Sequence, residues 1–214
     1  VIAPYPTKAL AQEAGMGISE YEEFVYRACM VDREDPVKEW LKESIKLDKI
    51  ARCLEKVHEL HYVGEGVDLY VRVDGRKWMK SDGKHNMPGG EVFTAPIEDS
   101  VEGYIEFSYP AIWHGREVEG VKLTFKKGCV VEAKAVRGQE FLNKILEVDE
   151  GARRVGEIAF GLNYNINRFT KEILFDEKIG GTIHLALGAA YPETGGKNVS
   201  AIHWDMIKDM KRCK

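Results

Sequence analysis

The chain has 214 residues, 44% of them hydrophobic, and its 31 basic and 35 acidic side chains give a formal net charge of −4. This balance is typical of a folded globular protein and disfavours a nucleic-acid binder, because phosphate recognition needs a clustered excess of Lys and Arg. No apolar run approaches the roughly 18 residues that span a bilayer, and no secretory signal is recognisable. Four cysteines without a C-x-x-C pair predict a reduced, cytoplasmic protein.

Residues 1–62 are predicted to form a mainly helical segment. Ser19 and Glu22 have the spacing of a capping box. They predict that a helix starts here, after two glycines, and contains the apolar run that follows. Asp35 stands directly before a proline and predicts the N-cap of a further helix, whose apolar residues follow a helical period to about Leu60.

Residues 63–214 change to a period of two and are predicted to form a sheet-rich domain. Asp74 and Gly75 predict a hairpin turn between strands at 69–73 and 77–80. Alternation predicts further strands at 104–108, 121–125, 130–135, 183–187 and 201–206, with a short helix at 139–147. The expected fold class is therefore α+β, with a helical N-terminal segment and a mixed-sheet domain.

Two apparent motifs do not carry chemistry. His58 and His61 flank a glutamate but lie one residue too close together for the H-E-x-x-H zinc helix, so we interpret them as the polar end of a helix. The Gly64–Gly66 segment begins like a dinucleotide loop, but its third glycine is missing, which favours a tight turn.

His203 and Asp205 are the first candidate functional pair. They stand two residues apart in a predicted strand, so both side chains share one face, and apolar neighbours indicate that the face is buried. An imidazole and a carboxylate arranged in this way can chelate a metal ion or form a hydrogen-bonded pair in the core. Both interpretations stay open at this point.

Four further residues stand in apolar or glycine-rich surroundings. His184 lies in an apolar strand, where a lone histidine is more often a hydrogen-bonded core residue than a ligand. Glu157 needs a partner, because an unpaired buried charge is costly. Glu91 lies in a structured loop between two prolines, and Glu177 alone would be interpreted as a solvated acid. Together these groups are typical ligands of zinc, cobalt or manganese, and a carboxylate-rich set suits a two-metal hydrolase.

At these residues the sequence resembles the thermophilic-type metallo-aminopeptidases, the family of aminopeptidases T, S and II. The matching blocks occur in family order from about residue 5 to residue 206. They are Tyr5-Pro6-Thr7, Glu20-Tyr21-Glu22-Glu23-Phe24, the segment from Asn86 to Pro96, Val155-Gly156-Glu157, Leu174-Phe175-Asp176-Glu177, His184-Leu185-Ala186-Leu187-Gly188 and His203-Trp204-Asp205.

The resemblance implies an exopeptidase that removes the N-terminal residue of peptides with water activated by two divalent ions, zinc, cobalt or manganese. It implies a homodimer as well. Glu91 would also shuttle a proton to the leaving amine, and Tyr191 would steady the tetrahedral intermediate. The implied metal ligands are Glu91, Glu157 (as the bridge), Glu177, His184, His203 and Asp205.

The chain also departs from the family pattern. It begins with Val1 and lacks the N-terminal α/β domain and final hairpin of family members, so we expect a segment of a longer protein. A second hypothesis is therefore a truncated, catalytically inactive fragment that binds metal or peptide. A third is an α+β protein without metal, in which the buried acids pair with each other.

Overall fold

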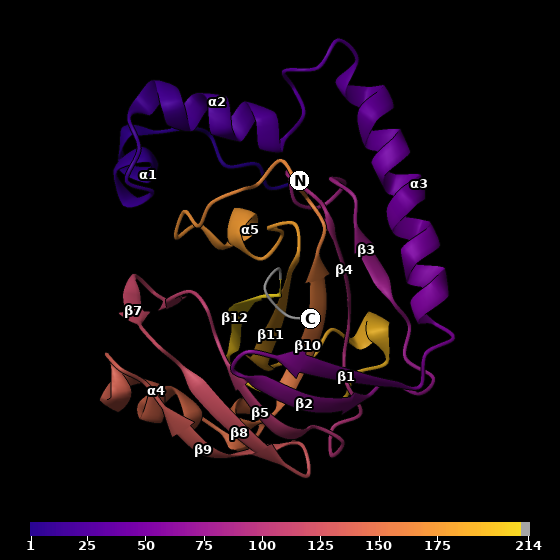
Figure 1. Cartoon of the computed structure of the whole chain (residues 1–214), viewed down its shortest axis with the longest axis vertical. Helices are drawn as coiled ribbons and strands as arrows, with labels where there is room; N and C mark the ends of the chain where they lie inside the picture. The colour runs from indigo at the N-terminus through magenta and orange to yellow at the C-terminus, as the bar shows by residue number, and fades with distance from the viewer. Residues whose placement is uncertain (211–214) are drawn as a thin grey trace.

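The computed structural model describes residues 1–210, and its chain begins with three helices (Figure 1). They are α1 (Lys8–Glu13), α2 (Ile18–Ala28) and α3 (Pro36–Leu54). The predicted N-cap of α3 is confirmed, because the Asp35 side chain accepts a hydrogen bond from the backbone N–H of Lys38.

Two sequence predictions in this segment are wrong. Helix α2 begins one residue before Ser19, and its N-cap is Gly17, so no capping box forms. Helix α3 ends at Leu54 rather than near Leu60, because the chain then enters strand β1 (Glu59–Gly64), which pairs along its whole length with β2 (Val67–Arg72). The predicted boundary at residue 62 falls within this strand.

The first five-stranded sheet is antiparallel and has the order β1-β2-β5-β8-β9. In β2, Leu69 and Val71 are buried and alternate with exposed neighbours, as a half-buried strand requires. The remaining strands of this sheet are β2 (Val67–Arg72), β5 (Glu102–Glu106), β8 (Lys122–Lys126) and β9 (Cys129–Lys134).

The second five-stranded sheet, also antiparallel, has the order β12-β11-β10-β4-β3. Its strands are β3 (Met79–Ser81), β4 (Glu91–Thr94), β10 (Val155–Gly161), β11 (Thr182–Gly188) and β12 (His203–Asp209). The predicted hairpin around Asp74 is wrong, because β3 pairs with β4 here while β2 pairs with β1 and β5. Strand β11, which lies between β12 and β10, is buried along its whole length.

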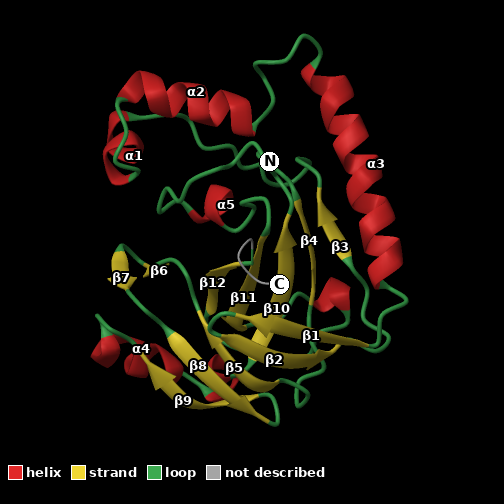
Figure 2. Ribbon diagram, in the orientation of Figure 1, coloured by secondary structure: helices red, strands yellow, loops and turns green. Residues whose placement is uncertain are grey.

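Short elements lie between the strands of the two sheets. They are the hairpin of β6 (Ala111–Trp113) and β7 (Arg116–Val118), the helices α4 (Gln139–Leu146) and α5 (Ile173–Asp176), and the 3-10 helices Glu150–Arg153 and Pro192–Thr194. Figure 2 shows α4 beside β8 and β9, and α3 alongside β3. The α+β fold class is therefore confirmed.

Two apolar clusters stabilise the fold. The larger joins both five-stranded sheets with α3 and α4. The smaller joins α1 and α2 to Phe175 of α5 and to Ile179. One face of α3 remains uncovered in the described chain, because Val37, Leu41 and Ile45 are 70%, 60% and 59% exposed.

Within residues 1–210 no helix is both long and apolar enough to cross a membrane. Of the four cysteines, Cys29, Cys53 and Cys129 are free, and Cys213 lies outside the described residues.

Candidate metal centre

The fold brings all six predicted ligand residues together, five on strands of the second sheet and Glu177 directly after α5. Ligand atoms within each of two groups lie within 4.8 Å of one another. The first group consists of Glu91, Glu177 and His184, and the second group consists of Glu157, His203 and Asp205. The side chains come from β4, β10, β11, β12 and the residue that follows α5.

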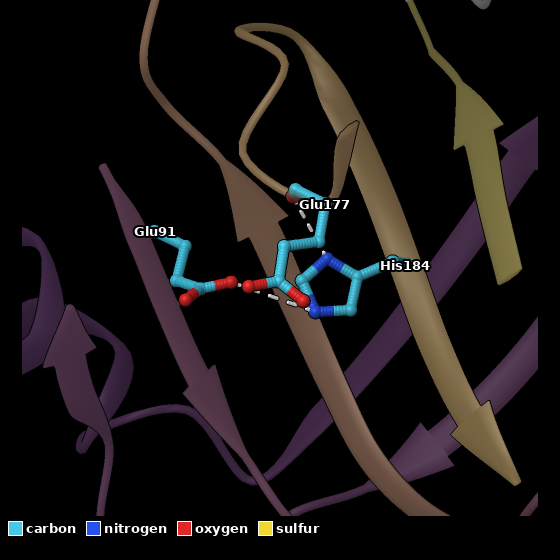
Figure 3. A group of neighbouring side chains, drawn as sticks. All are labelled: Glu91, Glu177 and His184. Atoms are coloured by element: carbon cyan, nitrogen blue, oxygen red, sulfur yellow. Dashed lines mark hydrogen bonds and ion pairs between the residues drawn. The ribbon is translucent and has the colours of Figure 1, made fainter. Parts of the chain in front are cut away.

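The first group joins two strands and a loop (Figure 3). Glu91 begins β4, and its Oε2 atom lies 3.6 Å from Nε2 of His184 on β11. Figure 3 shows the carboxylate of Glu177 pointing into the space between these two side chains. The first group can therefore offer two carboxylates and one imidazole to a single cation.

Glu157 connects the second group to the first. Its Oε2 atom lies 3.1 Å from Nε2 of His203, and its Oε1 atom lies 3.4 Å from Nε2 of His184. His203 and Asp205 share a face of β12, as the spacing predicted, with 3.7 Å between Nε2 and Oδ1. One carboxylate thus lies between the two imidazoles.

A local irregularity in β10 places Glu157. The register between β10 and β11 shifts between Val155 and Glu157, which is a β-bulge. Such bulges re-aim a side chain. Gly156 occupies the bulge, where the carbonyl oxygens of Gly188 and Ala189 approach so closely that no side chain fits. The position of Glu157 therefore depends on the glycine before it.

Both histidine rings are oriented by backbone carbonyl groups. Nδ1 of His184 lies 3.0 Å from the carbonyl oxygen of Glu177, and Nδ1 of His203 lies 2.8 Å from that of Ala189. A carbonyl oxygen only accepts, so each Nδ1 carries the hydrogen, and each Nε2 faces carboxylates. Metal-binding histidines are typically held in this way.

The site concentrates charge under strong burial. Burial raises the pKa of Glu91 to about 7 and that of Asp205 to about 6. Burial alone would also raise the pKa of Glu157, but hydrogen bonds from His184 and His203 outweigh it and hold this pKa at about 2.

The imidazoles respond in the opposite direction. Burial alone would lower their pKa values, but Glu157 raises the pKa of His184 to about 10 and, with Asp205, that of His203 to about 9. Protons on the two rings thus balance the carboxylates, and bound cations would take the place of these protons.

Two buried oxygens of the site have no hydrogen-bond partner among the described residues. They are Oε2 of Glu91 and Oδ1 of Asp205, one in each group. A buried acceptor without a donor is costly, and a cation bound by each group would satisfy both oxygens. The set of donors is also the mixture of oxygen and nitrogen that zinc, cobalt and manganese prefer, so the residues fit divalent cations.

Sequence reasoning missed Lys178. Its side chain is completely buried, its Nζ atom lies 3.3 Å from Oε1 of Glu91, and it forms an ion pair with Glu177. Burial alone would lower its pKa, but the charges of the two carboxylates raise it. A lysine next to an acid in a loop carries no signal in a single sequence, although its neighbour Glu177 was a predicted ligand.

A cavity of about 700 Å³ leads to the site from α3 and β3. Glu91, Glu157, Glu177, Tyr191 and His203 line its inner end. The Tyr191 ring lies 5.0 Å from the ring of His203 and 5.5 Å from that of Phe93. Tyr191, which is 45% exposed, is therefore beside the second group and accessible to a ligand.

The H-E-x-H segment lies elsewhere. It is not the end of a helix, as interpreted from the sequence, because His61 belongs to β1, where it pairs with Asp68 and stacks on Tyr70. His58 pairs with Asp74. Neither histidine belongs to the two groups.

Comparison with known proteins gives aminopeptidase relatives. The chain is 34% identical to aminopeptidase T of Thermus thermophilus over 96% of its own length and 58% of that protein. It is 34% identical to aminopeptidase 2 of Geobacillus stearothermophilus over 94% of its own length and 57% of that protein. The chain thus spans little more than half the length of these relatives.

Solved structures give the same result for the fold. The structure of aminopeptidase T from Thermus thermophilus matches this chain with a TM-score of 0.78 at 32% identity. The match covers 88% of this chain and 52% of the aminopeptidase T chain. A 2,5-dihydroxypyridine dioxygenase from Pseudomonas putida matches 98% of this chain and 67% of its own with a TM-score of 0.66, but its 16% identity indicates a shared fold alone.

A family model described as "Thermophilic metalloprotease (M29)" matches residues 1–213. The resemblance in the sequence blocks, the fold and the relatives agree with this match. The chain belongs to the thermophilic metalloprotease family M29.

Proposed function

We propose that this chain carries the catalytic centre of a metal-dependent aminopeptidase, which hydrolyses the N-terminal peptide bond with the help of two divalent cations. The orientation of the two imidazole rings carries the proposal. Each Nδ1 donates its hydrogen to a backbone carbonyl group, so Nε2 of His184 and Nε2 of His203 both face carboxylates. Two oxygens of these carboxylates are reached by no donor in residues 1–210.

The first group and the second group would each hold one cation, with Glu157 shared between them. Bound cations of this kind polarise a peptide carbonyl and lower the pKa of a water molecule. The role of the chain is to fix their spacing, because four of the six side chains project from the adjacent antiparallel strands β10, β11 and β12.

Two residues would act on the substrate. Glu91 lines the cavity, and its carboxylate can take a proton and pass it to the leaving amine. The Tyr191 hydroxyl can donate a hydrogen bond to the oxygen of the peptide carbonyl as negative charge develops there, since burial keeps this phenol protonated by raising its pKa.

The substrate would be a peptide with a free N-terminus. The inner end of the cavity carries the carboxylates of Glu91, Glu157 and Glu177, which attract an ammonium group. The cavity volume of about 700 Å³ is in the range of sites that bury small ligands. Names of the relatives support this substrate class, since all are aminopeptidases.

The test is an assay with leucyl-4-nitroanilide on the purified chain, first stripped with a chelator and then reloaded with cobalt, zinc or manganese. We expect turnover only when metal is present and none with N-acetylated substrate. Metal uptake without turnover would instead support the inactive fragment, and no uptake would support the protein without metal. Elemental analysis gives the number of ions per chain.

A homodimer and a cytoplasmic location stay predictions from the family resemblance and the cysteine content. The exposed apolar face of α3 is the kind of surface that a second subunit would cover in a dimer. Light scattering on the purified chain measures the oligomeric state, and fractionation of the source cells gives the location.

A further inference from the structure

We infer that Lys178 makes the two metal positions unequal, so that the second group binds its cation first and more tightly than the first group. This inference rests on the proposed metal centre. It adds a residue to that centre which does not bind the cations and acts on them through its charge.

The position of Lys178 is defined by two contacts. Its Nζ atom lies 3.3 Å from Oε1 of Glu91 and forms an ion pair with Oε1 of Glu177. Its side chain is 0% exposed, so water does not screen the ammonium group. Two carboxylates in direct contact favour the charged form of the ammonium.

The second group lacks such a cation. Within residues 1–210, the ion-pair partners of Glu157 and Asp205 are His184 and His203, and neither acid pairs with a lysine or an arginine. Each group has two carboxylates and one imidazole. With Lys178 included, the first group carries one negative charge when its imidazole is neutral, and the second group carries two.

This difference acts in two ways on a cation at the first group. The ammonium repels it at short range in a buried site, where charges interact strongly. The ammonium also occupies Oε1 of Glu91 and Oε1 of Glu177, so each carboxylate has one free oxygen. Neither effect operates at the second group.

The experiment is a calorimetric titration of the stripped, full chain with cobalt. We expect two binding steps whose dissociation constants differ by at least about tenfold, since a buried unit charge that contacts the ligand carboxylates changes affinity by that much or more. In Lys178→Met, which keeps the length of the side chain and removes the charge, the weaker step should tighten at least about tenfold. Lys178→Arg is the matched control and should keep the steps apart.

Two further variants assign the steps without changing Lys178. Glu177→Gln should weaken the second step only, and Asp205→Asn should abolish the tight step. Two equal steps in the unaltered chain, or an unchanged or wider separation in a folded Lys178→Met variant, would overturn the inference. The assignment by Glu177→Gln and Asp205→Asn still decides the order of filling if Lys178→Met does not fold. An absence of any binding would reject the metal centre itself.

Discussion

Gly156 lies so close to Ala189 that a Cβ atom on the glycine would be 2.3 Å from the Ala189 carbonyl oxygen. The same oxygen accepts the hydrogen bond from Nδ1 of His203. A single close approach therefore sets both the bulge that aims Glu157 and the ring orientation of His203.

Replacement of Gly156 by alanine should consequently damage the site and the fold together. The added methyl group must displace the Ala189 carbonyl, and overpacking of this kind costs about 1–3 kcal/mol. Urea unfolding measures the loss of stability, and cobalt titration should give weaker binding. Gly17→Ala is the control, because a Cβ at Gly17 meets no atom of the described chain within 4 Å. Equal metal affinity in Gly156→Ala and the unaltered chain would contradict the role of the bulge.

Glu157→Gln should abolish metal-dependent cleavage while the fold is retained. The change keeps the shape of the side chain but removes the charge between the two imidazoles, and we expect turnover to fall at least about 100-fold. Kinetics with leucyl-4-nitroanilide, circular dichroism and metal content check this. Glu132→Gln, at an exposed position of β9, should leave activity unchanged. Near-normal turnover in Glu157→Gln would count against the proposed centre.

Tyr191→Phe should lower kcat by about 10² to 10³, the typical effect of removing one donor to a developing oxyanion. The ring contacts with Phe93 and His203 remain possible, so the fold and the metal content should not change. Steady-state kinetics on the metal-loaded variant separates kcat from KM. A change in KM alone would indicate that Tyr191 binds substrate without stabilising the transition state.

An acid-sensitive contribution to stability is expected outside the two metal-binding groups, at Glu98. Its two oxygens lie 2.7 Å and 2.8 Å from Nη2 of the buried Arg76. Burial alone would raise the pKa of Glu98, but backbone N–H groups, including that of Lys197, and the Arg76 guanidinium lower it. Because the pKa is lowered on folding, the stabilisation exists above the unfolded pKa of about 4.3 and is lost as the pH falls through the folded pKa.

Glu98→Gln should therefore destabilise the chain by about 2 kcal/mol at pH 7, a typical contribution of a hydrogen bond to a charged group. The difference in the free energy of unfolding between Glu98→Gln and the unaltered chain should shrink below about pH 4, because the Glu98 carboxylate becomes protonated in the folded and the unfolded state. Urea unfolding at the two pH values measures both effects. A difference independent of pH would mean that packing, not charge, stabilises this pair.

The part of the site that the sequence could predict is the part with local constraints. His203 and Asp205 stand two residues apart in a strand, so their shared face follows from strand geometry. Glu91, Glu157 and His184 each stood in surroundings unusual for their polarity. Lys178 was beyond prediction, because its role depends on the folding of the loop after α5 against β4, which places its Nζ atom beside Glu91.

The errors in the fold have a common physical origin. Local turn chemistry at Asp74 predicted a hairpin. The pairing of strands depends, however, on contacts between residues far apart in the sequence, and β3 joins the second sheet. The apolar period continued past Leu54, yet the pairing of β1 with β2 ended the helix there. The same apolar period includes Val37 and Leu41, which the described chain leaves exposed.

The smaller apolar cluster gives the first thirty residues an influence on chemistry they do not touch. Phe24 packs against Phe175 with ring centroids 5.4 Å apart, and Phe175 stands two residues before Glu177. None of these N-terminal residues lines the cavity. Damage to the packing of α2 would nevertheless loosen the backbone that holds Glu177 and Lys178, so an enzyme with every ligand intact could fail through a substitution at Phe24.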